Sequence, residues 1–321
     1  MDWESEARVR RLFRQQELNI GRFFDIALSE YLDDLDIGRL ETLFQQGRIL
    51  EALDDIQNIA IATATANQSA IIAAANATTA YIQSGSVATV GFDVANTNTI
   101  NAMRRNKLEF VQDFTQKQIR ATRSALQAGV AEGIAPREMA RRFRSSIGLT
   151  EYQEKTVRNY RRYLQRIGGD DVPRRAQYEA LGRKLRDRRS DSVIRRAIRN
   201  QKPLSPDEID RMVEGYRRKA IKLRSETIAR TEALSSTHEG RNLAMGQAIE
   251  SGAIKAQDII RQWNTGQDGK QRPAHNELHK VKIGYGEVYQ NSIGAIAHPG
   301  DRSADAANVI NCRCIETFRL K

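Results

Sequence analysis

Both cysteines of this 321-residue chain stand in one short stretch, Asn311-Cys312-Arg313-Cys314. Two histidines, His275 and His279, precede them at a spacing of about one helical turn. Thiolate and imidazole are the ligands of closed structural zinc sites, so these residues form a candidate zinc site. The Cys-x-Cys spacing is not a usual zinc-finger spacing, and we expect both thiolates to reach one ion only if the backbone bends at Arg313.

Other interpretations of this stretch remain open. The thiols could be small buried side chains that flank Arg313, with its guanidinium paired to Asp268 or Asp301. His298 is a further candidate ligand if zinc is bound. A Cys312–Cys314 disulfide would be strained by the short separation and disfavoured in a reducing compartment.

Catalysis is a separate question for the same residues. His275 with Asp268 and Asp301 has the side-chain types of an acid–base cluster. The sequence pairs this set with no nucleophile elbow, no Gly-rich phosphate loop and no paired-carboxylate motif. We therefore expect no enzymatic activity, and a metal-dependent activity is kept as the alternative.

The elements that must position these residues are mostly helical. Apolar residues recur at spacings of three and four over about the first 250 residues, and only 6% of residues are aromatic while 28% are charged. After Gly252 the pattern changes to short strands, at 258–265 and 309–320, separated by turn sequences. The predicted fold class is mainly α, an extended helical body with a small C-terminal α+β domain. We expect three regions, 1–95, 96–225 and 226–321.

Local signals place several helix ends. A long helix is predicted from about Asn96 to Gly133, and Pro136 suits the first turn of the next helix. Capping boxes are predicted at Thr150 with Gln153 and at Ser205 with Glu208. The helical pattern from Ser205 to Gly252 is expected to contain one or two breaks, and a loop is expected at 168–173.

The segment 56–92 has no charged residue and is rich in alanine and threonine. Its length could span a bilayer, but asparagine and glutamine lie inside it and no Lys/Arg girdle brackets it. We expect a buried helix packed against copies of itself or a partner. Membrane contact is kept as the alternative.

The net charge of +11 is concentrated in one segment. Residues 137–230 carry 27 basic and 13 acidic side chains, and five of the nine tyrosines are interleaved with them. Such a surface binds nucleic acid through its phosphates, or an acidic protein, unless its arginines pair with the acids of the same segment. The candidate DNA contacts are Arg141, Arg142, Arg161, Arg162, Arg174, Arg175, Arg188, Arg189, Arg195 and Arg196.

Across the last hundred residues, an ordered set of motifs resembles the C-terminal domain of the phage Mu F-like head morphogenesis family. The motifs are Arg-Thr-Glu, Trp-x-Thr, Asp with Arg-Pro-x-His, Pro-Gly-Asp and Asn-Cys-Arg-Cys. They comprise Arg230, Thr231, Glu232, Trp263, Thr265, Asp268, Arg272, Pro273, His275, Pro299, Gly300, Asp301, Asn311, Cys312, Arg313 and Cys314. Arg230 and Glu232 are expected to form a structural ion pair. The stretch after His275 departs from the family's frequent Asp-Gly turn.

The resemblance implies a minor head protein inside a phage capsid near the portal, acting in head assembly, genome packaging or DNA ejection. Its implied partners are the portal protein, the major capsid protein and double-stranded DNA bound without sequence specificity, with self-association as a further interaction. The first twenty residues lack a secretory signal, so synthesis in the bacterial cytoplasm is expected. An ejected protein that accompanies the genome and contacts DNA or the host membrane is the alternative.

Overall fold

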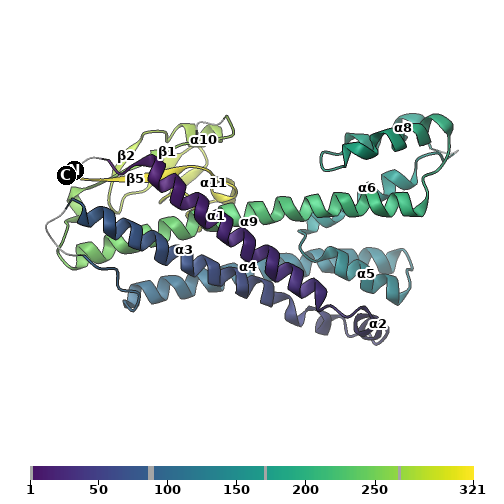
Figure 1. Ribbon diagram of the computed structural model, residues 1–321, viewed down its shortest axis with the longest axis horizontal. Coiled ribbons are helices and arrows are strands. Elements are labelled where there is room, and N and C mark those ends of the chain that lie inside the picture. The colour runs from purple at the N-terminus through teal and green to yellow at the C-terminus, as the bar shows by residue number, and fades with distance from the viewer. Residues whose placement is uncertain (1–2, 86–89, 170–171, 267–268) are drawn as a thin grey trace. The chain divides into compact units, whose positions relative to one another are not determined.

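The computed structural model describes residues 3–85, 90–169, 172–266 and 269–321, apart from the side chains of 49, 50, 54 and 55. The long helices are α1 (Glu6–Asp33), α3 (Gln57–Gln83), α4 (Thr97–Ala131) and α9 (Pro206–Glu250) (Figure 1). Shorter helices are α2 (Ile37–Gln45), α5 (Pro136–Ser146), α6 (Glu151–Gln165), α7 (Arg174–Gln177), α8 (Asp191–Asn200), α10 (Pro273–Asn276) and α11 (Ala306–Val309). The strands are β1 (Ile259–Asn264), β2 (Lys282–Gly284), β3 (Tyr289–Asn291), β4 (Gly294–Ile296) and β5 (Ile315–Leu320).

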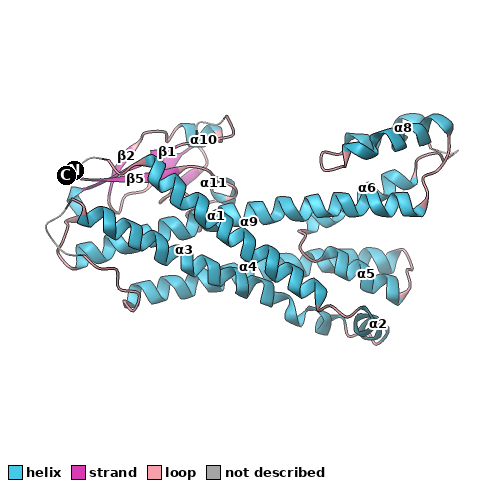
Figure 2. Ribbon diagram, in the orientation of Figure 1, coloured by secondary structure: helices cyan, strands magenta, loops and turns pink. Residues whose placement is uncertain are grey.

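All described strands follow α9, in the C-terminal part of the chain (Figure 2). The prediction of a mainly α protein with a small C-terminal α+β part is therefore confirmed. The predicted strand at 309–320 is shorter than expected, because its first residues form the end of α11 and an irregular stretch before β5.

The chain forms two compact units instead of three consecutive regions. Unit 1 comprises residues 1–29, 58–112 and 225–321, and unit 2 comprises 30–57 and 113–224. The expected boundary at 225/226 lies beside the observed one at 224/225. The expected boundary at 95/96 falls inside unit 1, because α3 and the first part of α4 belong to the same unit.

In unit 1 one face of the uncharged helix α3 is buried while its other positions are half-buried or exposed, and the buried face is covered in part by α9 of the same chain. A Cβ added to Gly240 of α9 would lie 2.0 Å from the carbonyl oxygen of Ile71 and 3.1 Å from the amide nitrogen of Ala75. The two backbones therefore meet without side chains between them. Asn67 Nδ2 donates to Glu232 Oε2 at 2.9 Å, which gives a polar side chain inside α3 a partner on α9. No helix among the described residues is long and apolar enough to cross a membrane.

The α+β part of unit 1 is built on β1. This strand lies between β2 and β5 in an antiparallel sheet, and β3 pairs with β4 separately. The buried Arg261 of β1 forms an ion pair with Glu316 of β5 at 2.9 Å, and Tyr289 Oη donates to the same carboxylate at 3.0 Å. The N-terminal segment joins this region, because Glu4 N donates to Phe318 O at 2.9 Å and Glu4 pairs with the buried Arg241 at 2.5 Å.

Unit 2 is held by helix caps and a core of its own. The capping box of Thr150 with Gln153 is present, and Ser205 with Glu208 makes the reciprocal hydrogen bonds of a second one. Pro136 opens α5 as predicted. The expected breaks in α9 are absent, since it is helical without interruption from Pro206 to Glu250. The phenol rings of Tyr160 and Tyr216 stack at 4.5 Å in the core.

Candidate metal centre

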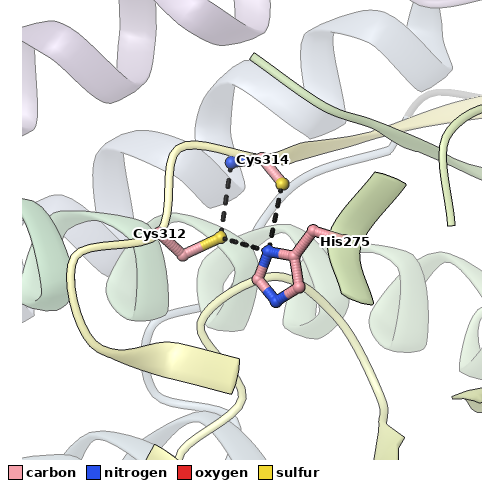
Figure 3. Close-up of side chains that lie close together, drawn as sticks. All are labelled: His275, Cys312 and Cys314. Atoms are coloured by element: carbon pink, nitrogen blue, oxygen red, sulfur yellow. Dashed lines mark hydrogen bonds between the residues drawn. The ribbon is translucent and has the colours of Figure 1, made fainter. Parts of the chain in front are cut away.

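Three of the four predicted zinc ligands meet in unit 1. The sulfur atoms of Cys312 and Cys314 lie 3.5 Å and 3.4 Å from Nδ1 of His275, and all three ligand atoms lie within 4.8 Å of one another (Figure 3). All three side chains are buried. Figure 3 shows both sulfurs turned toward the same ring nitrogen. This buried group could hold a metal ion.

The backbone around Arg313 brings the two sulfurs together. Residues 312–314 are irregular, Asn311 has a left-handed φ of 60°, and β5 begins only at Ile315. The expected bend is present, and its effect is to shorten the distance between the two side chains, since residues two apart on a strand already face the same side. An extended strand would hold these residues about 6.6 Å apart, beyond the roughly 4.6 Å that two metal–sulfur bonds can span. The Cys314 amide donates to Cys312 Sγ at 3.4 Å across the bend.

A one-turn helix and two buried neighbours fix His275. Helix α10 begins at Pro273, whose ring suits a first helical position. The Trp263 ring meets the His275 ring edge-on at 5.5 Å. On the far side of the imidazole, Nε2 lies 3.2 Å from Oδ1 of the buried Asn308. Because an amide oxygen only accepts, Nε2 is the donor in this contact, and Nδ1 is the ring nitrogen that faces the two sulfurs.

The two thiols hold their protons unequally. The hydrogen bond from the Cys314 thiol lowers the pKa of Cys312 well below its ordinary value, against the effect of burial, and His275 adds to the lowering. The same hydrogen bond, together with burial, raises the pKa of Cys314. Of the two sulfurs, Cys312 is therefore the one whose deprotonated form the surroundings favour. Both cysteines are free, so the disulfide interpretation is wrong for this structure.

His279 and His298 lie apart from the group formed by the described residues. Helix α10 ends at Asn276, so the assumed helical turn between His275 and His279 does not exist. His279 Nδ1 instead lies 2.9 Å from Thr265 Oγ1. His298 stacks on His238 with ring centroids 5.7 Å apart. The prediction of His279 as a ligand is not supported, because α10 is a single turn that ends before His279 and does not place its ring beside that of His275.

Two acidic residues, Asp301 and Asp268, were proposed as partners in this site, and the structure describes only Asp301. Asp301 accepts hydrogen bonds from Ala297 N at 2.9 Å and from Ser303 N and Oγ at 2.9 and 2.6 Å. It braces the turn at Gly300, where φ is +83° and an added Cβ would lie 2.8 Å from Ser235 N. Asp301 is thus a turn residue, outside the metal-binding group. Asp268, and with it the predicted Arg313–Asp268 pair, lies outside the described residues.

The remaining motif residues connect α9 to the metal-binding stretch. Arg230 donates to Asn311 Oδ1 and pairs with Glu17 of α1 at 2.8 Å, and Asn311 N donates to Thr231 Oγ1 at 3.0 Å. Arg272 donates to the carbonyl oxygen of Ile310. The two residues that precede Cys312 are therefore held by side chains from α9 and by Arg272.

The expected ion pair between Arg230 and Glu232 is wrong. Glu232 pairs with Arg302 and accepts from Asn67, while Arg230 pairs with Glu17. Residues two apart on a helix do not face each other, so their side chains reach different neighbours.

The ten candidate DNA-contacting arginines all belong to unit 2. Arg142 and Arg161 are half-buried and the other eight are exposed. Four of them pair with acids: Arg141 with Glu138, Arg142 with Glu132, Arg161 with Asp210 and Arg189 with Asp187. Among the described residues no ion pair involves Arg162, Arg174, Arg175, Arg188, Arg195 or Arg196. Internal pairing therefore accounts for only part of the basic surface.

Sequence reasoning missed the residues that support the metal-binding group. Asn308 sets the orientation of His275, and Arg10 of α1 donates to Thr265 O at 2.9 Å and to Arg313 O at 3.4 Å. Asn308 lies four residues before Cys312, a proximity that could have suggested a supporting role. Arg10 carries no such signal, because its contact joins residues about three hundred positions apart.

Comparisons with known proteins give no independent guide. No family model matches the chain, and neither the curated proteins nor the solved structures contain a significant match.

Proposed function

We propose that this chain is a minor head protein of a tailed bacteriophage, bound inside the capsid near the portal. In this role its C-terminal part is a zinc-stabilised module and the basic surface of unit 2 contacts packaged DNA without reading sequence. The observation that carries the proposal is the convergence of the motif residues. Trp263, Cys312 and Cys314 share one hydrophobic core, where the Trp263 ring contacts His275. Arg230 and Thr231 bind Asn311 directly before the cysteines.

Zinc is the metal that the ligand set supports best. Bonds of about 2.3 Å to sulfur and about 2.05 Å to nitrogen at a tetrahedral angle place the two ligand atoms about 3.5 Å apart. The sulfur–nitrogen distances of 3.5 and 3.4 Å fit this value. Zinc bound by His275, Cys312 and Cys314 would tie α10 to the stretch before β5. Because the bound ion stabilises only the folded chain, it would contribute to the stability of unit 1.

The zinc proposal is tested by metal analysis of protein purified without a histidine tag. We expect one zinc per chain, lost in Cys312→Ser and in His275→Ala but retained in His298→Ala, which changes a buried histidine outside the group. If the wild-type protein contains no zinc and does not take it up from solution, the zinc proposal fails.

Contact with DNA is supported by the exposed arginines of unit 2 that form no ion pair with a described residue. Arg195 and Arg196 of α8 are both exposed, and guanidinium groups on such a surface bind phosphate with release of counterions. We expect the chain to bind duplexes of unrelated sequence with equal affinity and strong salt dependence. The double variant Arg195→Gln/Arg196→Gln should reduce the salt slope by about two. Preference for one duplex sequence would contradict non-specific contact.

The virion role needs an experiment on particles. Phage particles are purified from cells that carry the gene in its own genomic setting, and the chain is quantified by mass spectrometry in full and DNA-free heads after external protease treatment. The proposal expects a few protected copies per head in both preparations. Absence from the particles would refute a minor head protein, whatever the results for zinc and DNA. Loss from emptied heads alone would favour the ejected-protein alternative.

A further inference from the structure

Unit 1 contains a second cavity, separate from the space between the metal-binding side chains. Its volume is about 300 Å³, and its described lining includes Arg10, Arg14, Glu17, Arg230 and Arg313. These residues come from α1, from α9 and from the bend before β5. Four arginines surround one glutamate, so the cavity has a cationic lining among the described residues.

Arg230 and Arg10 are held in place by contacts that use only some of their N–H donors. Arg230 pairs with Glu17 at 2.8 Å and donates to Asn311 Oδ1. Arg10 donates to Thr265 O at 2.9 Å and lies 3.6 Å from Glu6. A guanidinium has five N–H donors in a fixed fork, so each arginine can bind a further oxygen atom without breaking these contacts.

Arg14 supplies a less constrained cation to the same cavity. It lies one helical turn after Arg10 on α1, and its side chain is exposed. Within the described part of the chain no ion pair involves Arg14. Glu17 is the only carboxylate of the described lining, and it is already paired with Arg230.

We propose that this cavity binds a phosphate group. Guanidinium forks match the geometry of phosphate oxygens and bind them through paired, charge-assisted hydrogen bonds. A phosphate would meet the spare donors of Arg10 and Arg230 and the guanidinium of Arg14, which is in no ion pair with a described residue. A volume of about 300 Å³ is at the small end of the range for ligand sites, which fits a phosphate with its immediate substituent.

The site adjoins the metal-binding group and is distinct from the basic surface of unit 2. Gly266 and Arg313 also line a smaller cavity of about 90 Å³, whose lining includes His275, Cys312 and Cys314. The proposal rests on unit 1 alone, so it stands or falls independently of the virion role.

Inorganic pyrophosphate is the first probe, with binding to the full-length chain measured by calorimetry at low ionic strength. Arg14→Gln should weaken binding about tenfold, because it removes a charge-assisted hydrogen bond. Glu17→Gln should strengthen binding several-fold, because it removes the only carboxylate of the described lining. Arg22→Gln is the matched control, an exposed arginine on the same helix that does not line the cavity. Thermal melts of all variants show whether the fold is intact.

The two lining variants and the control together decide whether the cavity binds the anion. Weaker binding in Arg14→Gln or stronger binding in Glu17→Gln, with Arg22→Gln unchanged, supports the site. Absence of pyrophosphate binding at millimolar concentration, or no change in either lining variant, overturns it. An equal loss in Arg14→Gln and Arg22→Gln also overturns it, because the anion would then respond to total charge.

A second set of probes identifies the source of the phosphate. A short duplex with 5′-phosphates is compared with the same duplex carrying 5′-hydroxyls, in the wild type and in Arg14→Gln. Stronger binding of the phosphorylated duplex that is lost in the variant indicates a terminal phosphate. Equal binding of both duplexes that is weakened in the variant indicates a phosphodiester of the nucleic-acid backbone. Duplex binding that the variant leaves unchanged contradicts a nucleic-acid source.

Discussion

Replacing Gly240 with alanine should destabilise unit 1, although the same change normally stabilises a helix. Alanine in a helix interior is favoured over glycine by about 1 kcal/mol. At Gly240 the new Cβ would lie 2.0 Å from Ile71 O and 2.9 Å from the carbonyl carbon of the same residue. Both atoms belong to the backbone of α3, so no side-chain rotation relieves the clash and the helices must move apart by more than 1 Å. Overpacking of this kind costs about 1–3 kcal/mol or more, and we expect Gly240→Ala to lower the free energy of unfolding by about 2 kcal/mol.

The matched control is Gly246→Ala on the same helix, where the added Cβ would lie 3.6 Å from Tyr285 Oη, an ordinary contact. This variant should equal the wild type or exceed it by up to about 1 kcal/mol. Urea unfolding followed by tryptophan fluorescence reports on unit 1, because both tryptophans, Trp3 and Trp263, belong to it. If Gly240→Ala proves as stable as Gly246→Ala, the close approach of α3 and α9 is wrong.

Further predictions concern the metal-binding group and the turn at Asp301. Asn308→Leu should lower metal affinity about 10- to 100-fold in chelator competition, because His275 loses the partner of Nε2, while the exposed Asn276→Leu should not. His279→Ala should retain the full metal content measured by mass spectrometry; a loss of metal would place it among the ligands. Burial alone would raise the pKa of Asp301, but hydrogen bonds from Ser303 Oγ and from backbone amides hold that pKa below its ordinary value of 3.8. The carboxylate therefore contributes stability above pH 3.8 that is lost as the pH falls through the lowered pKa. Asp301→Asn should cost about 1–2 kcal/mol at neutral pH, and its difference from the wild type should shrink below pH 3.8; a constant difference would contradict the assignment.

The parts of the fold that the sequence predicts correctly depend on nearby residues. The capping box of Thr150 with Gln153 and the helix start at Pro136 are short-range signals, and both are present. The burial of α3 follows from its lack of charge. The packing partner of α3 could not be predicted from the sequence. The close contact at Gly240 joins two helices that are far apart along the chain.

In the candidate site, too, the residues close together in sequence were predicted correctly. The errors concern contacts that depend on the course of the backbone between them. Cys312 and Cys314 are close in sequence, so their proximity was safe to infer. His279 was predicted as a ligand on the assumption that one helix carries both His275 and His279. Helix α10 ends at Asn276, so that assumption does not hold. The roles of Asn308 and Arg10 depend on the tertiary fold, and residue type alone does not reveal them.

The hydrogen bond between Glu4 and Phe318 has a consequence for biosynthesis. Unit 2 ends at Arg224, so a ribosome has synthesised all of its residues before it reaches the first strand of the sheet. Unit 1 needs residues from both sides of this insertion, and its Glu4–Phe318 contact forms only after the last strand has been made. Translation therefore favours completion of unit 2 first, while the apolar faces of α1 and α3 wait for α9 and β5. During that interval the nascent chain exposes the surfaces that a chaperone, or an early assembly partner, would protect.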